Sequence, residues 1–131
     1  MIDDMSLLRT TLAIAHATRP DDRRTLTEVM VDTGSEYNWI PNTVLQELGV
    51  EPERTDAFEA ADGRILHRPV GFARIFAGGR SALAPVVFAD ADDMTLLGAV
   101  GLETLNLRVD LGRRELVPAG PMPVAFRACA S

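Results

Sequence analysis

The sequence predicts a mostly β domain that carries one or two short helices. Apolar runs rich in β-branched residues, such as 29–31 and 82–88, recur along the chain and are short enough to be strands. The dipeptides Asp62-Gly63 and Gly78-Gly79 lie between such runs and favour hairpin reversals. A helical face of apolar residues is expected over 42–48, with Pro41 before it and Gly49 after it.

The chain of 131 residues has the length of one ordinary domain, and 47% of its residues are hydrophobic, so it can bury a core. We therefore expect a single domain over residues 1–131. Beyond Pro118, the closely spaced Gly120, Pro121 and Pro123 predict an irregular tail, with one extended piece at 124–126.

Charge and hydropathy exclude two classes of partner. The net charge is −6 and no basic cluster interrupts it, so nucleic acid is not expected to bind. No apolar run approaches the ~18 residues of a membrane span, so no membrane is expected. Cys129 is the single cysteine and forms no internal disulfide, which fits a reducing, cytoplasmic location.

The segment 12–17 superficially resembles the end of a secretory signal. Asp3 and Asp4 make the preceding residues acidic where a signal needs positive charge, so the segment is interpreted as part of a first strand. We expect that strand over 7–18, a polar turn at 19–24 and a return strand over 25–31.

The second half of the chain is expected to continue as strands. After an undefined polar connection at 51–58, the segments 58–61 and 65–76 bracket Asp62-Gly63. Pro85 places part of the next strand, 82–88, at a sheet edge or a bulge. Shorter elements are expected after it: an acidic loop at 90–93, a strand at 95–97, a helix at 99–105, a strand at 107–111, a turn at 112–114 and a strand at 115–117.

The return strand ends at Asp32-Thr33-Gly34-Ser35, an unusual place for a carboxylate. Burying an ionised Asp without partners is costly, so a buried strand that runs directly into one needs a turn that satisfies the charge or a reaction that uses it. Gly34 permits unusual backbone conformations, and the hydroxyls of Thr33 and Ser35 can donate hydrogen bonds to the carboxylate or the nearby backbone.

These residues resemble the active-site turn of aspartic proteases, and the chain is similar to the single-domain, retropepsin-like (retroviral-type) members of that family. A second motif downstream supports the resemblance: Leu96-Leu97-Gly98, followed by Leu102, Leu105 and the run 107–110, is similar to the segment that packs behind the catalytic turn. Ala61-Asp62-Gly63 stands between the two motifs, where the family has its flap hairpin.

The resemblance implies a retropepsin-like closed β-barrel or sandwich, the acid-protease fold, and an aspartic endopeptidase that needs no cofactor or metal. With one Asp-Thr-Gly per chain, Asp32 from each subunit of a homodimer would share a proton and activate a water against an extended peptide or protein substrate. Thr33 would hydrogen-bond across the dimer axis, Gly34 would admit the substrate backbone, and Ser35 would hydrogen-bond the carboxylate. The substrate-binding flap would carry Ala61, Asp62 and Gly63.

Simpler interpretations stay open for several of these residues. Asp32 can be a structural turn residue, and Trp39 can line a subsite or simply pack. His16 and His67 lack metal-ligand spacing, and the acidic residues of 90–93 lack the pattern of a calcium loop and are interpreted as solvated. The alternative function is a non-catalytic dimerisation or peptide-binding module that has the same fold.

Overall fold

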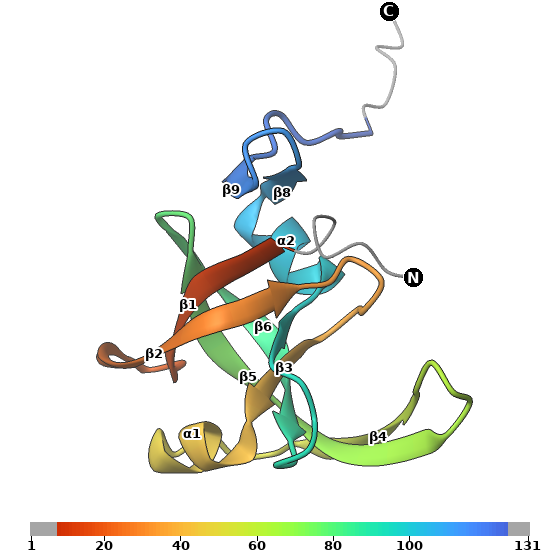
Figure 1. Ribbon diagram of the computed structural model, residues 1–131. Coiled ribbons are helices and arrows are strands. Elements are labelled where there is room, and N and C mark those ends of the chain that lie inside the picture. The colour runs from red at the N-terminus through yellow and green to blue at the C-terminus, as the bar shows by residue number, and fades with distance from the viewer. Residues whose placement is uncertain (1–7, 126–131) are drawn as a thin grey trace, which may run out of the picture.

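The computed structural model describes residues 8–125 of the chain. Figure 1 shows strands that wrap around a common interior, with a long hairpin extending from one side. In chain order the elements are β1 (Leu8–His16), β2 (Arg19–Val31), β3 (Asn38–Pro41), α1 (Asn42–Glu47), β4 (Arg54–Glu59), β5 (Ile65–Ala77), β6 (Arg80–Ala89), β7 (Leu96–Leu97), α2 (Ala99–Leu105), β8 (Leu107–Asp110) and β9 (Glu115–Pro118). The mostly β prediction with few short helices is confirmed.

The main sheet closes on itself. Its strand order is β1-β2-β7-β3-β6-β5-β4, and β1 also pairs with β5, so that every strand but β4 belongs to a ring. Two pairs in this ring are parallel, β2 with β7 and β3 with β6. The pair β8–β9 forms a separate small sheet, which Figure 1 shows beyond α2 and away from the ring.

The hydrophobic core fills the interior of the ring. Alternate residues of the strands point inward, as β5 shows with Ala73, Ile75 and Ala77 buried, while Phe72 is exposed. Full burial of a Leu, Ile or Val side chain stabilises the fold by about 1.5–3 kcal/mol. The largest fully buried apolar side chains are Leu12, Ile14, Ile40, Leu45, Ile75, Leu97, Leu105, Val29, Val70, Val86 and Val87.

The first hairpin forms as predicted, but its turn lies elsewhere. The strands reverse at residues 17–18, and the charged segment 19–24, expected to be the turn, is the start of β2. Ala15 pairs with Arg23 and His16 with Arg19. The side chains of this segment are exposed, apart from the half-buried Arg24, so water solvates their charges and the charges do not oppose a strand.

Both helices lie where the sequence placed them. Helix α1 begins after Pro41 and ends at Glu47, with Leu48 as its C-cap and Gly49 in the left-handed region at φ 76°. Helix α2 covers the predicted 99–105 and ends at Asn106, which adopts the left-handed conformation at φ 54°.

The two predicted glycine reversals differ in geometry. Gly78 and Gly79 both have positive φ and join β5 to β6 by a tight turn. In the β4–β5 hairpin only Gly63 has positive φ, and its amide donates to the Ala60 carbonyl at 2.9 Å. That hairpin is therefore longer than a two-residue turn, because the preceding strand β4 ends at Glu59.

Strand β6 runs through Pro85 without a break. It pairs with β5 along its length, but its pairing with β3 begins only at Val86, so Pro85 lies where β6 has one strand neighbour. The missing amide therefore costs no ladder hydrogen bond, in agreement with the predicted edge position.

The tail after β9 begins with hydrogen bonds to the end of α2. The Ala119 amide donates to the Asn106 carbonyl at 2.9 Å, and the Asn106 side chain donates to the Gly120 carbonyl at 3.0 Å. Residues 119–125 have no regular structure, whereas residue 126, Cys129 and the acidic pair Asp3 and Asp4 lie outside the described residues. Within residues 8–125, each helix is too short to span a membrane.

Candidate functional site

Asp32 follows the last residue of β2, and the parallel neighbour β7 fixes its position. The Asp32 amide donates to the Leu97 carbonyl at 3.0 Å, and two residues earlier the Met30 amide donates to the Thr95 carbonyl at 3.2 Å. The backbone of Asp32 is therefore held by the sheet, while its side chain is partly exposed. A carboxylate held in this way changes position little during a reaction.

The turn provides a hydrogen bond to only one of the two carboxylate oxygens of Asp32. The Gly34 amide donates to Asp32 Oδ1 at 2.9 Å, and the Ser35 amide donates to the Asp32 carbonyl at 3.1 Å. Within residues 8–125, Asp32 Oδ2 receives no hydrogen bond. One oxygen of this carboxylate is thus available to a water molecule or a second carboxyl group.

The three residues after Asp32 make different contacts within the single chain. The Ser35 hydroxyl donates to the Tyr37 carbonyl at 3.1 Å, which is the nearby backbone and not the carboxylate. Gly34 needs no positive φ, but an added Cβ would lie 3.2 Å from Asp32 Oδ1. Thr33 is exposed, and its hydroxyl has no partner within the described residues.

Helix α2 supports the turn from behind. The Ala99 and Val100 amides donate to the carbonyls of Ser35 and Glu36 at 2.8 and 2.9 Å, respectively. The amides in the first turn of a helix have no partner within the helix, and here two carbonyl groups of the loop after Asp32 accept hydrogen bonds from them. A Cβ on Gly98 would lie 2.7 Å from the Ser35 carbonyl oxygen, which explains why only glycine fits. Gly98 and helix α2 of the downstream motif therefore pack behind the turn as predicted, whereas the run 107–110 forms β8 in the separate small sheet.

Asn38 links this support to the core, and sequence reasoning missed it. Its side chain is fully buried in β3 and donates to the Pro85 carbonyl at 3.0 Å, while its Oδ1 accepts the Gly98 amide at 2.9 Å. Both bonds span large sequence separations, so no local pattern indicates them. The available signal was a single amide side chain between the apolar residues Tyr37 and Trp39.

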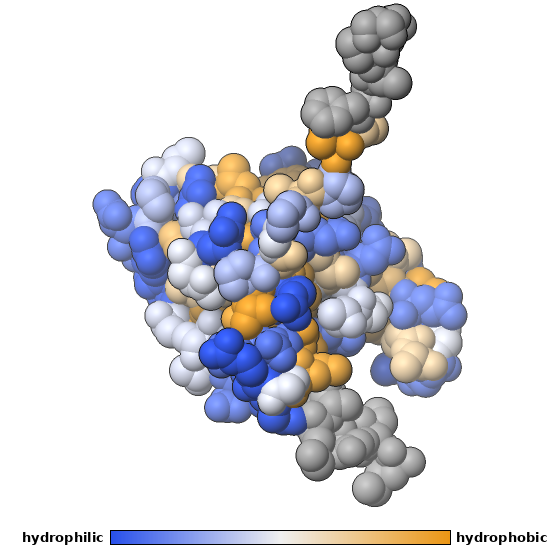
Figure 2. Space-filling view, turned by 90° about the horizontal axis from the view of Figure 1, so that it is seen from above, coloured by the Kyte–Doolittle hydropathy of each residue, from blue (hydrophilic) through white to orange (hydrophobic). Residues whose placement is uncertain are grey.

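A cleft with a volume of about 900 Å³ opens beside Asp32. The active-site turn and β3 line one side, and the β4–β5 hairpin lines the other. In Figure 2 the tip of that hairpin is the separate lobe to the right of the main body. The lining residues are Asp32, Gly34, Ser35, Glu36, Tyr37, Trp39, Asp56, Ala57, Phe58, Glu59, Ala60, Ala61, Leu66, Met94 and Leu96.

Aromatic rings join the two sides of the cleft at its base. Phe58 of β4 packs edge-on against Trp39 and Tyr37, with ring centroids 5.1 and 6.1 Å apart. Arg54 donates to the Tyr37 hydroxyl at 3.1 Å and to Asp56 at 3.0 Å. Trp39 therefore both lines the cleft and packs, and these contacts hold the hairpin arm against β3.

Arg68 and Asp93 form a second link between the hairpin and the body. Two hydrogen bonds, of 2.7 and 3.1 Å, join the guanidinium of β5 to the carboxylate, whose side chain is only 12% exposed. The hydrogen bonds from Arg68 lower the pKa of Asp93, and the Asp90 amide lowers it further. The expectation of a solvated acidic loop is therefore wrong for Asp93, because its partner is 25 residues away in sequence.

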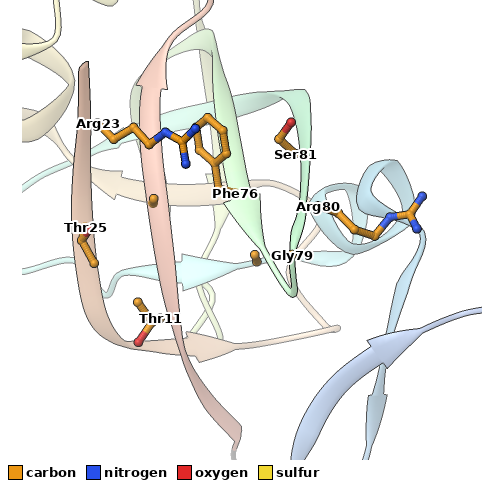
Figure 3. A pocket seen from close by; sticks show the side chains of 9 residues that line it. Thr11, Arg23, Thr25, Phe76, Gly79, Arg80 and Ser81 are labelled. Carbon is orange, nitrogen blue, oxygen red and sulfur yellow. The ribbon is translucent and has the colours of Figure 1, made fainter. Parts of the chain in front are cut away.

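A smaller hollow of about 480 Å³ lies on the outer side of the sheet between β1, β2, β5 and β6. Figure 3 shows the Arg23 guanidinium beside the Phe76 ring, and its central carbon is 3.8 Å from the ring centroid. Arg23 also donates to the Pro20 carbonyl at 2.9 Å, whereas Arg80 extends away from Arg23 in the same view. The remaining lining residues are Thr11, Ala13, Thr25, Ala77, Gly79 and Ser81.

The predicted site residues fall into two groups. Asp32, Gly34, Ser35 and Ala61 line the same cleft, whereas Thr33, Asp62 and Gly63 lie outside its lining. Within residues 8–125, no three His, Cys, Asp or Glu side chains are arranged to hold a metal ion. Asp32 is the predicted catalytic residue among the carboxylates that line this cleft, and its backbone is held by β7.

Comparison with known proteins agrees with this geometry. The aspartyl protease family matches residues 20–103. None of the curated proteins compared with the chain matches it.

Among solved structures, EIAV protease complexed with the inhibitor HBY-793 aligns with 72% of this chain and 84% of that chain, at 19% identity and a TM-score of 0.52. The solution structure of the simian foamy virus (mac) protease covers 72% of this chain and 91% of that chain, at 17% identity and a TM-score of 0.49. The retropepsin-like acid-protease fold predicted from the sequence is confirmed. This chain belongs to the aspartyl protease family.

Proposed function

We propose that this protein is an aspartic endopeptidase that hydrolyses peptide bonds in extended polypeptide segments, with an active site shared by two copies of the chain. The setting of Asp32 carries the proposal. Its amide is bonded to β7 at the end of β2, one carboxylate oxygen has no partner in residues 8–125, and the residue lines a cleft large enough for a peptide.

The need for a second copy follows from the chemistry. Hydrolysis of an amide by carboxylates uses two of them, one to accept a proton from water and one to donate a proton to the substrate carbonyl. The sequence contains a single Asp-Thr-Gly. Two-fold symmetry would bring Asp32 of a second copy to the first. The exposed hydroxyl of Thr33, which has no partner within residues 8–125, supports a hydrogen bond across that axis.

In the proposed reaction the two Asp32 carboxyl groups hold one proton between them. The ionised group accepts a proton from the bound water as the water oxygen attacks the carbonyl carbon, and the protonated group gives its proton to the carbonyl oxygen. The tetrahedral intermediate then collapses: the C–N bond breaks as the protonated carboxyl group gives its proton to the leaving nitrogen, and a hydroxyl of the intermediate gives its proton to the other carboxylate as the C=O bond forms, so the pair again holds one proton. Atoms and charge balance without a cofactor.

The β4–β5 hairpin is proposed as the flap over the substrate. Ala61 lines the cleft, and Asp62 and Gly63 form the tip beside it, where Asp62 is fixed by hydrogen bonds from the Arg64 backbone amide and side chain at 3.0 and 2.8 Å. An extended peptide between flap and floor would form main-chain hydrogen bonds with both and would exclude water from the reacting bond.

The test compares the wild type with Asp32→Asn, using an unfolded protein substrate from about pH 4 to 7. The amide cannot exchange the proton, so cleavage should fall by a factor of about 1000 or more while the far-ultraviolet circular dichroism is unchanged. Asp21→Asn is the matched control, because Asp21 is exposed in β2 and lies outside the cleft. Cleavage by Asp32→Asn at the wild-type rate would refute the proposal.

A further inference from the structure

We infer that the cleft selects peptide segments in which a lysine or arginine side chain stands among apolar ones. This inference rests on the proposed function and names the substrate class of the same site. It follows from the charge, the pairing and the apolar surroundings of the cleft residues.

The charges that line the cleft are all of one sign. Its lining contains Asp32, Glu36, Asp56 and Glu59, and it contains no arginine or lysine. The chain has 13 basic residues, so this is not a consequence of their scarcity. A concave surface with charges of one sign attracts side chains of the opposite sign and repels those of its own.

Two of these carboxylates are uncompensated. Asp56 is paired with Arg54 at 3.0 Å, and Asp32 belongs to the proposed reaction. The side chains of Glu36 and Glu59 have no hydrogen bond or ion pair within residues 8–125. Glu36 follows the active-site turn and Glu59 ends β4, so the two come from the opposite sides of the cleft.

The backbone positions of both glutamates are fixed even though their side chains have no partner. The Glu36 carbonyl accepts the Val100 amide at 2.9 Å, and Glu59 is paired with Ile65 across the hairpin. A peptide that enters the cleft therefore meets two carboxylates whose main-chain positions are set before binding. The main chain then needs no ordering when a ligand binds, so the entropy lost there is that of the two glutamate side chains.

The uncharged part of the lining favours the same class of side chain. Tyr37, Trp39 and Phe58 provide ring surfaces, and Leu66, Met94 and Leu96 provide aliphatic ones. A lysine or arginine can lay its aliphatic stem on such surfaces and direct its charged end to a carboxylate. Acidic side chains would gain the apolar contact only at the cost of like-charge repulsion.

The first arm of the experiment measures cleavage. The full chain is given matched short peptides that have the same apolar sequence and carry Lys, Gln or Glu at one position near the scissile bond, which is varied along the peptide. At near-neutral pH and low salt, kcat/KM should fall about fivefold from Lys to Gln, and further from Gln to Glu. High salt should reduce these ratios, because it screens exposed charges.

The variants Glu36→Gln and Glu59→Gln, alone and together, locate the preference. The double variant should remove most of the Lys-over-Glu ratio, chiefly through KM. Glu103→Gln is the matched control, since Glu103 is exposed on α2 and lies outside the cleft, and it should keep the wild-type ratio. An unchanged ratio in the double variant would overturn the inference.

The second arm measures binding of the same peptides to Asp32→Asn by fluorescence anisotropy, which requires no cleavage. Tighter binding of the Lys peptide, lost on adding both glutamine substitutions, supports the inference even if the wild type cleaves nothing, a result that would refute the proposed function alone. Equal binding of the Lys and Glu peptides would overturn the inference while leaving the proposed function intact. If no peptide binds, the inference is overturned too.

Discussion

The cleft beside Asp32 is lined by acidic residues and the hollow around Arg23 by basic ones. The more informative difference between them is that Arg23 has partners within the chain. Arg23 is stacked on Phe76 and donates to the Pro20 carbonyl. In the cleft, Glu36, Glu59 and one oxygen of Asp32 have no partner within residues 8–125. A satisfied side chain contributes to packing, whereas a fixed backbone with an unsatisfied side chain is prepared for a ligand.

The backbones of the two regions are supported to different extents. The loop that carries Asp32 donates a hydrogen bond to β7 and accepts two from α2, and the buried side chain of Asn38 accepts the Gly98 amide at the start of α2. The Arg23 hollow is formed by the outer faces of ordinary strands and by the Gly78-Gly79 turn. Substitutions behind the cleft should therefore cost more stability than similar substitutions at the hollow.

The largest effect on stability is expected from Gly98→Ala. A Cβ there would lie 2.7 and 2.9 Å from the carbonyl oxygens of Ser35 and Glu36, and backbone cannot yield as a flexible side chain does. We expect a loss of about 3 kcal/mol in the free energy of unfolding, measured by urea denaturation, together with loss of cleavage.

Gly79→Ala is the matched substitution at the Arg23 hollow. Gly79 has φ 76°, but an added Cβ would meet no atom within 4 Å, so only backbone strain remains. It should cost about 1 kcal/mol. Equal losses for the two alanine variants would contradict the difference in support between the regions.

An effect between those of the two glycine substitutions is expected from Asp93→Asn, which breaks the link between the hairpin and the body. Arg68 would lose its two hydrogen bonds to the largely buried carboxylate and keep only the longer contact with Asp90 at 3.5 Å, so the free energy of unfolding should fall by about 2 kcal/mol. Arg23→Gln, which removes an exposed contact with Phe76, should cost at most about 1 kcal/mol and leave cleavage unchanged. A larger loss in the free energy of unfolding for Arg23→Gln than for Asp93→Asn would contradict the stronger support of the cleft.

The pH dependence of that link has a definite sign. Arg68 lowers the pKa of Asp93 in the folded chain below its unfolded value of 3.8, so the unfolded chain binds the proton more readily. The stabilisation is therefore fully present above about pH 5 and is lost as pH falls below about 4. The difference in the free energy of unfolding between wild type and Asp93→Asn, measured by denaturation, should therefore shrink as pH falls through that range. A difference that grew as pH fell would contradict this linkage.

Local patterns in the sequence predicted what depends on local physics. Helix α2 was predicted to the residue, because apolar residues fill the short interval between Gly98 and Asn106. The charged segment 19–24 was assigned to a turn because its exposed strand positions have the composition of a loop. Its place in β2 follows from pairing with β1, and a composition argument does not contain that information.

The features of the site also divide into those that a local sequence pattern indicates and those that depend on contacts between distant segments. Asp32 was found because a carboxylate directly after an apolar strand is locally unusual. Asn38 and the Arg68–Asp93 pair act through contacts between distant segments, and the charge of the cleft arises only when β4 is folded over the active-site turn. These features depend on tertiary structure, so they were not predicted.

The most direct test of the central claim, that two copies share one active site, mixes wild type with Asp32→Asn at constant total protein concentration, after the chains have had time to exchange partners. A site that needs Asp32 from both copies predicts activity proportional to the square of the wild-type fraction, about one quarter at equal amounts. Activity proportional to the fraction itself, about one half in the same mixture, would show that each chain works alone and would contradict the claim.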